Sequence, residues 1–312
     1  MAGPVRTTLA ASCFVLLPDA CLQEKAKPTM TGKPIHEVVS CMGQPVAGNP
    51  TEFMFERAFA AAGLDWRYVT FEVPPGNLEA ALAGMRAMSF RGGNFTIPHK
   101  VSVIQYLDGL SKAAELMGAV NCVNASGGEL IGENTDGKGF VASLKELVQP
   151  EGTRVVILGA GGAARAISVE LGLEGVTEIV VVNRTAARGE ELVNLINGRV
   201  GVPARLESSD GVDYAVPPGT DIVINATSIG LGDAEARVPL VVESLEPSMV
   251  VADVVFNPPQ TRLLRDAADR GCRILDGLGM LVNQAVIGFR IWTGVEPDAS
   301  VMREALEEYL GL

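Results

Sequence analysis

The sequence lacks the patterns that hold a metal ion, a disulfide framework or a nucleic acid. Its five cysteines are odd in number, widely spaced and without a CxxC pair, so neither a zinc site nor a set of disulfides is predicted. The two histidines have no partner pattern. With 25 basic and 37 acidic residues, the net charge is −12. Because a phosphate-binding surface needs clustered Lys and Arg, we expect no nucleic-acid partner.

Long apolar runs are also missing. No stretch of about 18 apolar residues occurs, so we expect no transmembrane helix and no membrane partner. Residues 7–17 form a short apolar segment after Arg6, as in a secretory signal, but hydroxyl side chains interrupt it and no clean cleavage site follows. We therefore expect residues 1–33 to be a disordered extension or the result of a misassigned start upstream of Met30. The expected location is the cytoplasm, with reduced thiols.

Glycine and aliphatic residues are abundant. Hydrophobic residues make up 47% of the chain and aromatic residues only 5%, and 35 glycines are present. This composition is typical of an α/β enzyme with many tight turns between strands and helices. At 312 residues the chain is about twice the length of a typical domain, so we expect two domains that share a cleft.

The first half alternates between strand and helix patterns. Strands are expected at 37–42, 66–73 and 92–97, helices at 51–62, 77–88 and 101–108, and a hairpin between 120–125 and 129–132. Alternation of this kind predicts parallel pairing, with helices on both faces of the sheet.

A second α/β unit is expected after a helix from Asn134 to Val148 and a hinge at 150–152. Its predicted strands are 154–158, 178–182, 221–225, 249–254 and 273–275, with a helix at 163–173. The segments 280–292 and 300–310 are expected to be helices that pack back onto the first domain. The predicted fold class is therefore α/β, with an N-terminal α/β domain, a Rossmann-type domain and returning C-terminal helices.

A dinucleotide-binding pattern lies at the start of the second unit. Residues 159–164 read Gly-Ala-Gly-Gly-Ala-Ala and match G-x-G-x-x-G/A between a predicted strand and a predicted helix. Gly159 allows the tight turn, Gly161 lets the backbone approach a pyrophosphate, and Ala164 permits close helix packing. The helix N-terminus would then offer free N–H groups to the phosphates.

The end of the next predicted strand favours NADP over NAD. NAD enzymes place an acidic residue there for the ribose hydroxyl, whereas this chain has Asn183, Arg184 and Thr185, with Arg188 one turn later. Two guanidinium groups and a hydroxyl suit a ribose phosphate. The alternative is a solvated loop with two surface arginines.

Lys100 and Asp136 are candidates for proton transfer. Each follows a turn motif at the start of a predicted helix, a place where a side chain can point into a cleft. A lysine near a carboxylate and a bound ketone can exchange a proton with the alkoxide that hydride transfer creates or consumes. Taken alone, each residue is more often a surface charge, because most Lys and Asp residues are.

Several segments together resemble the shikimate dehydrogenase family, in the family's order and at near-family spacing from Glu37 to Leu312. The segments are 94–100 (NFTIPHK), 118–121 (GAVN), 134–137 (NTDG), 159–164, 183–185, 225–228 (NATS) and 277–284 (GLGMLVNQ). The resemblance implies an NADP-dependent oxidoreductase that interconverts 3-dehydroshikimate and shikimate, in chorismate and aromatic amino acid biosynthesis. It also implies an extension at 1–33, a substrate domain at 34–137, an NADP domain at 138–277 and C-terminal helices at 278–312.

The resemblance also implies roles for individual residues. Lys100 would be the catalytic acid or base and Asp136 its partner. Thr96, Asn121 and Gln284 would contact substrate hydroxyls. The residues expected to contact NADP are Gly159, Ala160, Gly161, Gly162, Ala163, Asn183, Arg184, Thr185, Arg188, Thr227, Val254 and Gly277. No pattern sets the oligomeric state, and a homodimer is the assembly we considered.

One loop departs from the family. The family has two serines after a Gly-x-Pro turn that hold the substrate carboxylate, whereas residues 43–50 read GQPVAGNP, two residues shorter and without a serine. Asn49 could still donate through its amide, and Phe256 stands where the family commonly has a Tyr. Three hypotheses follow: a shikimate dehydrogenase with an altered carboxylate pocket, a dehydrogenase of quinate or another shikimate-like acid, or a non-catalytic NADP-binding regulator.

Overall fold

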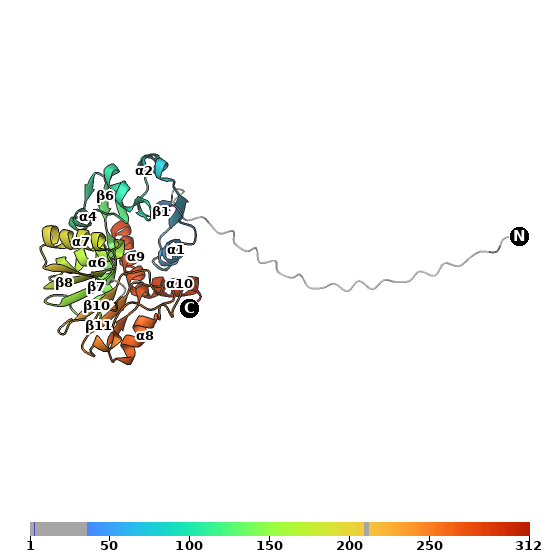
Figure 1. The fold of residues 1–312 in the computed structure, drawn as a ribbon. Helices are drawn as coiled ribbons and strands as arrows, with labels where there is room; N and C mark the ends of the chain where they lie inside the picture. Colours follow the sequence, from blue (N-terminus) through green and yellow to red (C-terminus); the bar gives the residue numbers. More distant parts are fainter. Residues whose placement is uncertain (1–2, 4–35, 209–211) are drawn as a thin grey trace. The chain divides into compact units, whose positions relative to one another are not determined.

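The structure, a computed structural model, describes Gly3, residues 36–208 and residues 212–312. Ile35–Leu312 pack as one compact unit that contains two six-stranded sheets (Figure 1). The expectation for residues 1–33 lies outside the described residues, apart from Gly3. No described helix is long and apolar enough to cross a membrane.

The first sheet has the strand order β2-β1-β3-β5-β6-β4. Its strands are β1 (Glu37–Gly43), β2 (Trp66–Glu72), β3 (Gly92–Phe95), β4 (Gly109–Leu110), β5 (Cys122–Ser126) and β6 (Glu129–Glu133). The parallel pairing expected from strand–helix alternation is confirmed for β1 with β2 and with β3, and the expected hairpin is present as β5 and β6. β5 runs antiparallel to both β3 and β6. A tight turn at Gly127 and Gly128, both with positive φ, returns the chain at once and leaves no room for a crossover.

The helices of the first half are α1 (Thr51–Ala61), α2 (Leu78–Ala87), α3 (His99–Ser102) and α4 (Lys112–Met117). The helix expected at 101–108 starts two residues earlier, at His99, and continues as a 3-10 turn, Val103–Tyr106. The earlier start places Lys100 in the first turn of α3. Helix α4 was not predicted, since it has only six residues.

The second sheet is entirely parallel, in the order β12-β11-β10-β7-β8-β9. Its strands are β7 (Arg154–Leu158), β8 (Glu178–Asn183), β9 (Ala204–Ser208), β10 (Ile222–Asn225), β11 (Val250–Asp253) and β12 (Arg273–Leu275). The sheet starts at its centre with β7 and reverses direction between β7 and β10, which is the Rossmann arrangement that was expected. A ligand of such a sheet lies at this reversal, beyond the carboxyl ends of the strands.

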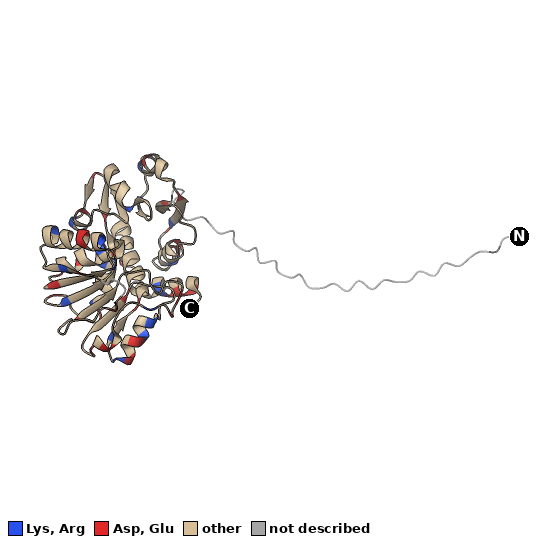
Figure 2. Cartoon of the chain, in the orientation of Figure 1, with Lys and Arg blue, Asp and Glu red and all other residues tan. Residues whose placement is uncertain are grey.

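Helices cover both faces of the second sheet. Residues of α6 (Gly162–Leu173) and α7 (Ala186–Leu195) share one apolar core with β7 and β8, and α8 (Arg262–Asp269) packs on the opposite face. Helix α8 carries Arg262, Arg265, Asp266 and Asp269, and none of the four is buried, since the buried residues of this helix are Leu263, Leu264 and Ala267 (Figure 2).

The two C-terminal helices, α9 (Gly277–Thr293) and α10 (Ala299–Leu310), pack on the first sheet as expected. Phe55 of α1 lies at the centre of this contact. Its ring lies 5.2 Å from that of Trp292 and 6.2 Å from that of Phe289. These buried aromatic contacts hold α9 against α1.

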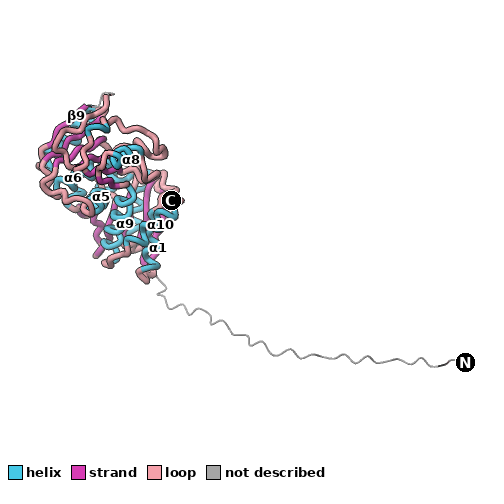
Figure 3. Tube along the Cα trace, turned by 90° about the horizontal axis from the view of Figure 1, so that it is seen from below, coloured by secondary structure: helices cyan, strands magenta, loops and turns pink. Residues whose placement is uncertain are grey.

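Helix α5 (Thr135–Leu144) joins the two sheets through glycines. It is shorter than the expected helix to Val148, and it lies beside α9 (Figure 3). A Cβ at position 139 would lie 2.6 Å from the backbone nitrogen of Gln284, and one at position 137 would overlap the carbonyl of Ala166 in α6. Only glycine allows α5 to approach both helices this closely.

We therefore expect Gly139→Ala to destabilise the protein by about 1 to 3 kcal/mol, because the added methyl overlaps the backbone of α9. The matched control is Gly84→Ala, in a helix position where a Cβ would meet only the terminal carbon of Met88, 3.6 Å away. This control should be neutral or more stable by up to about 1 kcal/mol. Urea unfolding followed by circular dichroism measures both, and equal midpoints for the two variants would contradict the close approach.

Candidate active site

An amine and a carboxylate meet at the start of two helices. The Nζ atom of Lys100, in the first turn of α3, lies 2.6 Å from Oδ2 of Asp136, in the first turn of α5. The side chains are 34% and 22% exposed, so the pair is open to a ligand on one side. The structure thus brings together the two residues that the sequence predicts for proton transfer.

Asp136 is held by a network of amides. The side chain of Asn134 caps α5 and accepts from the backbone N–H of Asp136, at 3.2 Å. The Nδ2 group of Asn121 donates to Oδ1 of Asp136 at 2.8 Å and to Oγ1 of Thr135 at 3.0 Å. With one oxygen bonded to an amide and the other to Lys100, the carboxylate has a defined orientation before any ligand binds.

The same network reaches α9. Thr135 is fully buried, its N–H donates to Oδ1 of Asn121 at 2.7 Å, and its hydroxyl donates to Oε1 of Gln284 at 3.3 Å. The amide of Gln284 also donates to the carbonyl of Leu281 at 3.1 Å. Asn121 and Gln284 are both buried, so in the structure they hold Thr135 and Asp136 in place.

Lys100 is fixed through its backbone. Its carbonyl accepts from the N–H of Val120 at 2.7 Å. The neighbouring His99 is fully buried, and its Nε2 lies 2.7 Å from the carbonyl oxygen of Val73. His99 therefore anchors α3 to the loop after β2, which is a structural role, as expected from its lack of a pattern.

The pair opens into a cavity of about 850 Å³ that extends to the glycine-rich turn. Of the predicted site residues, those that line it are Thr96, Lys100, Asp136, Ala160, Gly161, Gly162, Ala163, Arg188, Val254 and Gly277. Those that do not line it are Asn49, Asn121, Gln284, Gly159, Asn183, Arg184, Thr185 and Thr227. The cavity size suits a dinucleotide end together with a small substrate.

The glycine-rich turn has the geometry that the sequence predicts. Gly159 has φ +107° and packs on Ala226 and Thr227, so it must be glycine. A Cβ at Gly161 or Gly162 would meet nothing within 4 Å, which leaves open space at the N-terminus of α6. Free N–H groups beside open space are what a pyrophosphate needs.

Two arginines stand out at the end of β8. Within residues 36–208 and 212–312, Arg184 and Arg188 have neither an ion pair nor a hydrogen bond, whereas every other described arginine has one. Both are exposed. Asn183, directly before Arg184, donates through its side-chain amide to the carbonyl of Thr185 at 2.7 Å and shapes the turn. Unpaired guanidinium groups here are available to a phosphate.

Several cavity residues were not predicted. Met280 and Leu281 belong to the segment 277–284. Their position near the start of α9 is the signal from which their contact with the cavity could have been predicted. Arg165 donates to the carbonyl of Met117 and to Glu191, and it lines the cavity from the first turns of α6. Phe256, the residue that departs from the family, also lines it.

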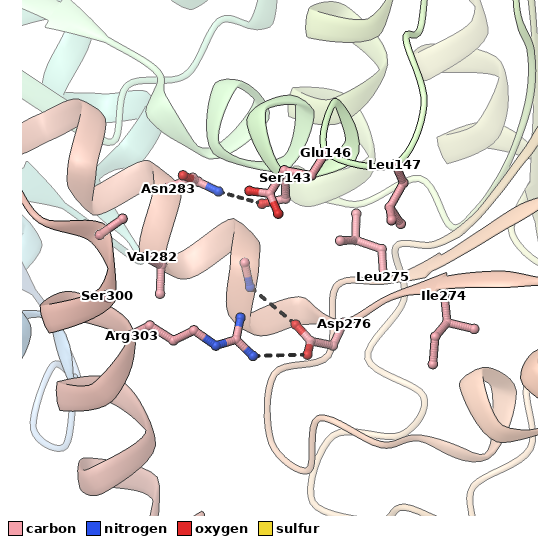
Figure 4. Close-up of a pocket in the computed structure, with 12 residues that line it drawn as sticks. Ser143, Glu146, Leu147, Ile274, Leu275, Asp276, Val282, Asn283, Ser300 and Arg303 are labelled. Carbon is pink, nitrogen blue, oxygen red and sulfur yellow. Dashed lines mark hydrogen bonds and ion pairs between the residues drawn. The ribbon is translucent and has the colours of Figure 1, made fainter.

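A smaller cavity of about 370 Å³ lies elsewhere on α9 (Figure 4). Its polar groups pair with one another: Asn283 donates to Ser143 at 2.8 Å, and Asp276 lies 3.5 Å from Arg303 and caps α9. It contains none of the predicted site residues. The larger cavity is therefore the candidate active site.

Cys41 and Cys122 lie near the site but are not suited to chemistry. Both are buried and free, and burial raises the pKa of the Cys41 thiol to about 11 and the pKa of the Cys122 thiol further still. A thiol that stays protonated at neutral pH is a poor nucleophile.

The fold and the site together define a class of protein. A Rossmann sheet whose glycine-rich turn shares one cavity with a lysine–aspartate pair is the arrangement of a dinucleotide-dependent oxidoreductase. Family models divide the chain in the same way. "Shikimate dehydrogenase substrate binding domain" matches residues 41–123, "Shikimate / quinate 5-dehydrogenase" matches 143–230, and "Shikimate 5'-dehydrogenase C-terminal domain" matches 277–307. The chain belongs to the shikimate dehydrogenase family.

Three relatives illustrate the range of this family. The shikimate dehydrogenase (NADP(+)) of Methanopyrus kandleri is 43% identical over 88% of this chain and 96% of its own. A Thermus thermophilus shikimate 5-dehydrogenase solved with NADP(H) and shikimate is 35% identical, with TM-score 0.75, over 88% of this chain and all of its own (100%). The 5-ketofructose reductase of Gluconobacter sp. strain CHM43 is 50% identical, with TM-score 0.87, over 88% of this chain and 99% of its own.

Proposed function

We propose that this chain is an NADP-dependent oxidoreductase that interconverts 3-dehydroshikimate and shikimate. The observation that carries the proposal is the contact between Lys100 and Asp136 at 2.6 Å, in the same cavity as the glycine-rich turn. Relatives about 40% identical over most of the chain are named shikimate dehydrogenase (NADP(+)). The same names disfavour a dehydrogenase specific for quinate and a non-catalytic regulator.

The chemistry needs a proton at the substrate oxygen. NADPH, when bound, supplies the hydride for reduction of the ketone, and NADP accepts it in the reverse direction. As negative charge develops on the carbonyl oxygen, the ammonium of Lys100 stabilises it and donates a proton. The carboxylate of Asp136 keeps the amine in position and accepts from a substrate hydroxyl.

Thr96 lines the cavity beside Lys100, and we propose that it contacts a substrate hydroxyl directly. The donors of Asn121 already serve Thr135 and Asp136, so its main role is to position them. Gln284 uses one amide hydrogen on Leu281 and keeps the second for the substrate.

The cofactor would lie across the reversal point of the second sheet. Gly161 and Gly162 leave room for the pyrophosphate, and Arg184 and Arg188 would bind the ribose phosphate. A cytoplasmic location and assembly as a homodimer remain proposals. The buried free thiols Cys41, Cys122 and Cys272 are compatible with a reducing compartment.

A second substrate class is favoured by one observation. Residues 43–50 contain no hydroxyl side chain for a carboxylate, and a relative at 50% identity is a 5-ketofructose reductase. That sugar is an uncharged polyhydroxy ketone, so its reduction needs the same hydride and proton transfer without a carboxylate pocket. We therefore propose uncharged polyhydroxy ketones as the alternative substrates.

Loss of the amine tests the proposed reaction. In Lys100→Ala the developing alkoxide has no proton donor, so we expect kcat to fall by about 100-fold or more, while the Kd for NADPH stays within about twofold. Absorbance of NADPH at neutral pH measures turnover with shikimate, quinate and 5-ketofructose in turn. Lys112→Ala, at the start of α4, is the matched control. Tight NADPH binding with no turnover of any compound by the parent protein would contradict the proposal.

Removal of the two arginine charges tests the proposed binding of the NADP ribose phosphate. In Arg184→Ala with Arg188→Ala, the ribose phosphate loses two charge-assisted partners, so we expect NADPH binding to weaken by about 100-fold and NADH binding by less than about threefold. Isothermal titration of each dinucleotide measures this preference. Arg199→Ala serves as control, since this exposed arginine donates to the carbonyl of Glu115 instead. Equal losses for both dinucleotides would place the phosphate elsewhere.

A further inference from the structure

The loop at residues 43–50 lies against the reacting end of the cavity. Gly43 ends β1 beside Thr96, where a Cβ would overlap the methyl group of that threonine. The N–H of Gln44 donates to the carbonyl of Ile97 at 2.9 Å. Because Thr96 and Ile97 line the cavity with Lys100, this loop packs behind the part of the wall that these residues form, and none of residues 43–50 lines the cavity itself.

The side chains of the loop offer little to an anion. Val46 is 5% exposed and belongs to the same apolar cluster as Phe256. The Oδ1 atom of Asn49 accepts from the N–H and the hydroxyl of Thr51, at 2.9 and 2.6 Å. Its Nδ2 group faces Cys41, 4.0 Å away, and the exposed Gln44 carries the other side-chain amide of the loop. Neutral amide donors can bind a hydroxyl but do not offset the charge of a carboxylate.

The backbone of the loop is occupied by a carboxylate of the chain itself. Glu72 ends β2 directly opposite Gly43, and its Oε1 accepts from the N–H of Val46 at 3.3 Å. The carboxyl ends of β1, β2 and β3 meet at one edge of the sheet, so Glu72 and Thr96 flank the loop on its two sides. The carboxylate of Glu72 therefore occupies the N–H of Val46 and adds a negative charge beside the loop.

Nearby charges do not offset Glu72. Glu52, in the first turn of α1, adds a second carboxylate close enough to raise the pKa of Cys41. Lys100 lowers the pKa of the same thiol, but its charge is matched by Asp136. A substrate carboxylate at this loop would meet repulsion on one side and an apolar wall on the other.

We propose that Glu72 is a specificity-determining residue that lowers the affinity of the site for carboxylate substrates relative to uncharged polyhydroxy ketones. The proposal rests on the proposed function, because it assumes hydride transfer at the same site. It goes further in assigning substrate selection to one side chain that does not touch the reacting atoms.

The test is Glu72→Gln, which keeps an acceptor for the N–H of Val46 and removes only the charge. We expect the ratio of kcat/KM for shikimate to kcat/KM for 5-ketofructose to rise about threefold or more at low salt, mainly through a lower KM for shikimate. The gain should shrink as salt is added, which a purely structural role for Glu72 would not produce. Glu129→Gln removes the same charge at the opposite edge of the same sheet, and its ratio should match that of the parent protein.

The outcomes separate the two proposals. If the parent protein neither reduces NADP with shikimate nor oxidises NADPH with 5-ketofructose, the proposed function fails. If Glu72→Gln leaves the ratio unchanged or alters it equally at all salt concentrations, the role of Glu72 is refuted and the hydride-transfer function stands. A salt-sensitive rise in the ratio supports the role.

Discussion

The site depends on how closely α5 approaches its neighbours. Asp136 can face Lys100 and the glycine-rich turn together only because Gly137 and Gly139 let α5 contact α6 on one side and α9 on the other. A side chain at either position would push the helix away by more than the tolerance of a hydrogen bond at 2.6 Å. The position of Asp136 relative to Lys100 therefore depends on backbone packing between the two sheets. The side-chain amides of Asn121 and Asn134 then orient Asp136 through hydrogen bonds.

The distribution of charged side chains also bears on the proposed cofactor site. The chain carries a net charge of −12, yet the turn after β8 presents two arginines with no partner among the described residues. In a chain that pairs its other described arginines, two unpaired cations after β8, the strand beside β7, support the proposed binding of an external anion there. The acidic residues over the rest of the surface repel such an anion, which disfavours its binding at other positions.

How well each element could be predicted from the sequence depends on how deeply that element is buried. Strands β7 and β8 were predicted to within a residue because both faces are covered, so the apolar run is continuous. Strand β9, at the sheet edge, was missed because its residues are only half-buried and include charges. Helix α8 was missed for a related reason, since five of its eight residues are polar or exposed alanine, although Thr261 caps it. The parallel pairing of β1 with β2 and β3 and the hairpin of β5 and β6 were predicted, but the antiparallel pairing of β3 with β5 was not, because alternation does not show which strand a hairpin joins.

For the site, short motifs predicted which residues gather but not how they bond. The hydroxyl of Thr135 bonds to Gln284, 149 positions away, and no local pattern could reveal that link. Asn121 and Gln284 are predicted to touch the substrate; in the structure Asn121 donates to Asp136 and Thr135, and Gln284 accepts from Thr135. Their residue types carry information about hydrogen-bonding capacity, and only the three-dimensional arrangement shows which partner uses that capacity.

The loop at 43–50 bears on how one scaffold could change its substrate and keep its reaction. In the proposed reaction, hydride and proton transfer use Lys100 and Asp136, in the first turns of α3 and α5, and the turn at Gly159–Gly161, directly before α6. The loop between β1 and α1, which we propose acts on the substrate's far end, lies outside the acid–base pair. Under this proposal, Val46 and the occupation of its N–H by Glu72 lower affinity for a carboxylate without disturbing that pair. A change of this kind acts on binding alone, so it offers a short evolutionary path from an anionic to an uncharged ketone.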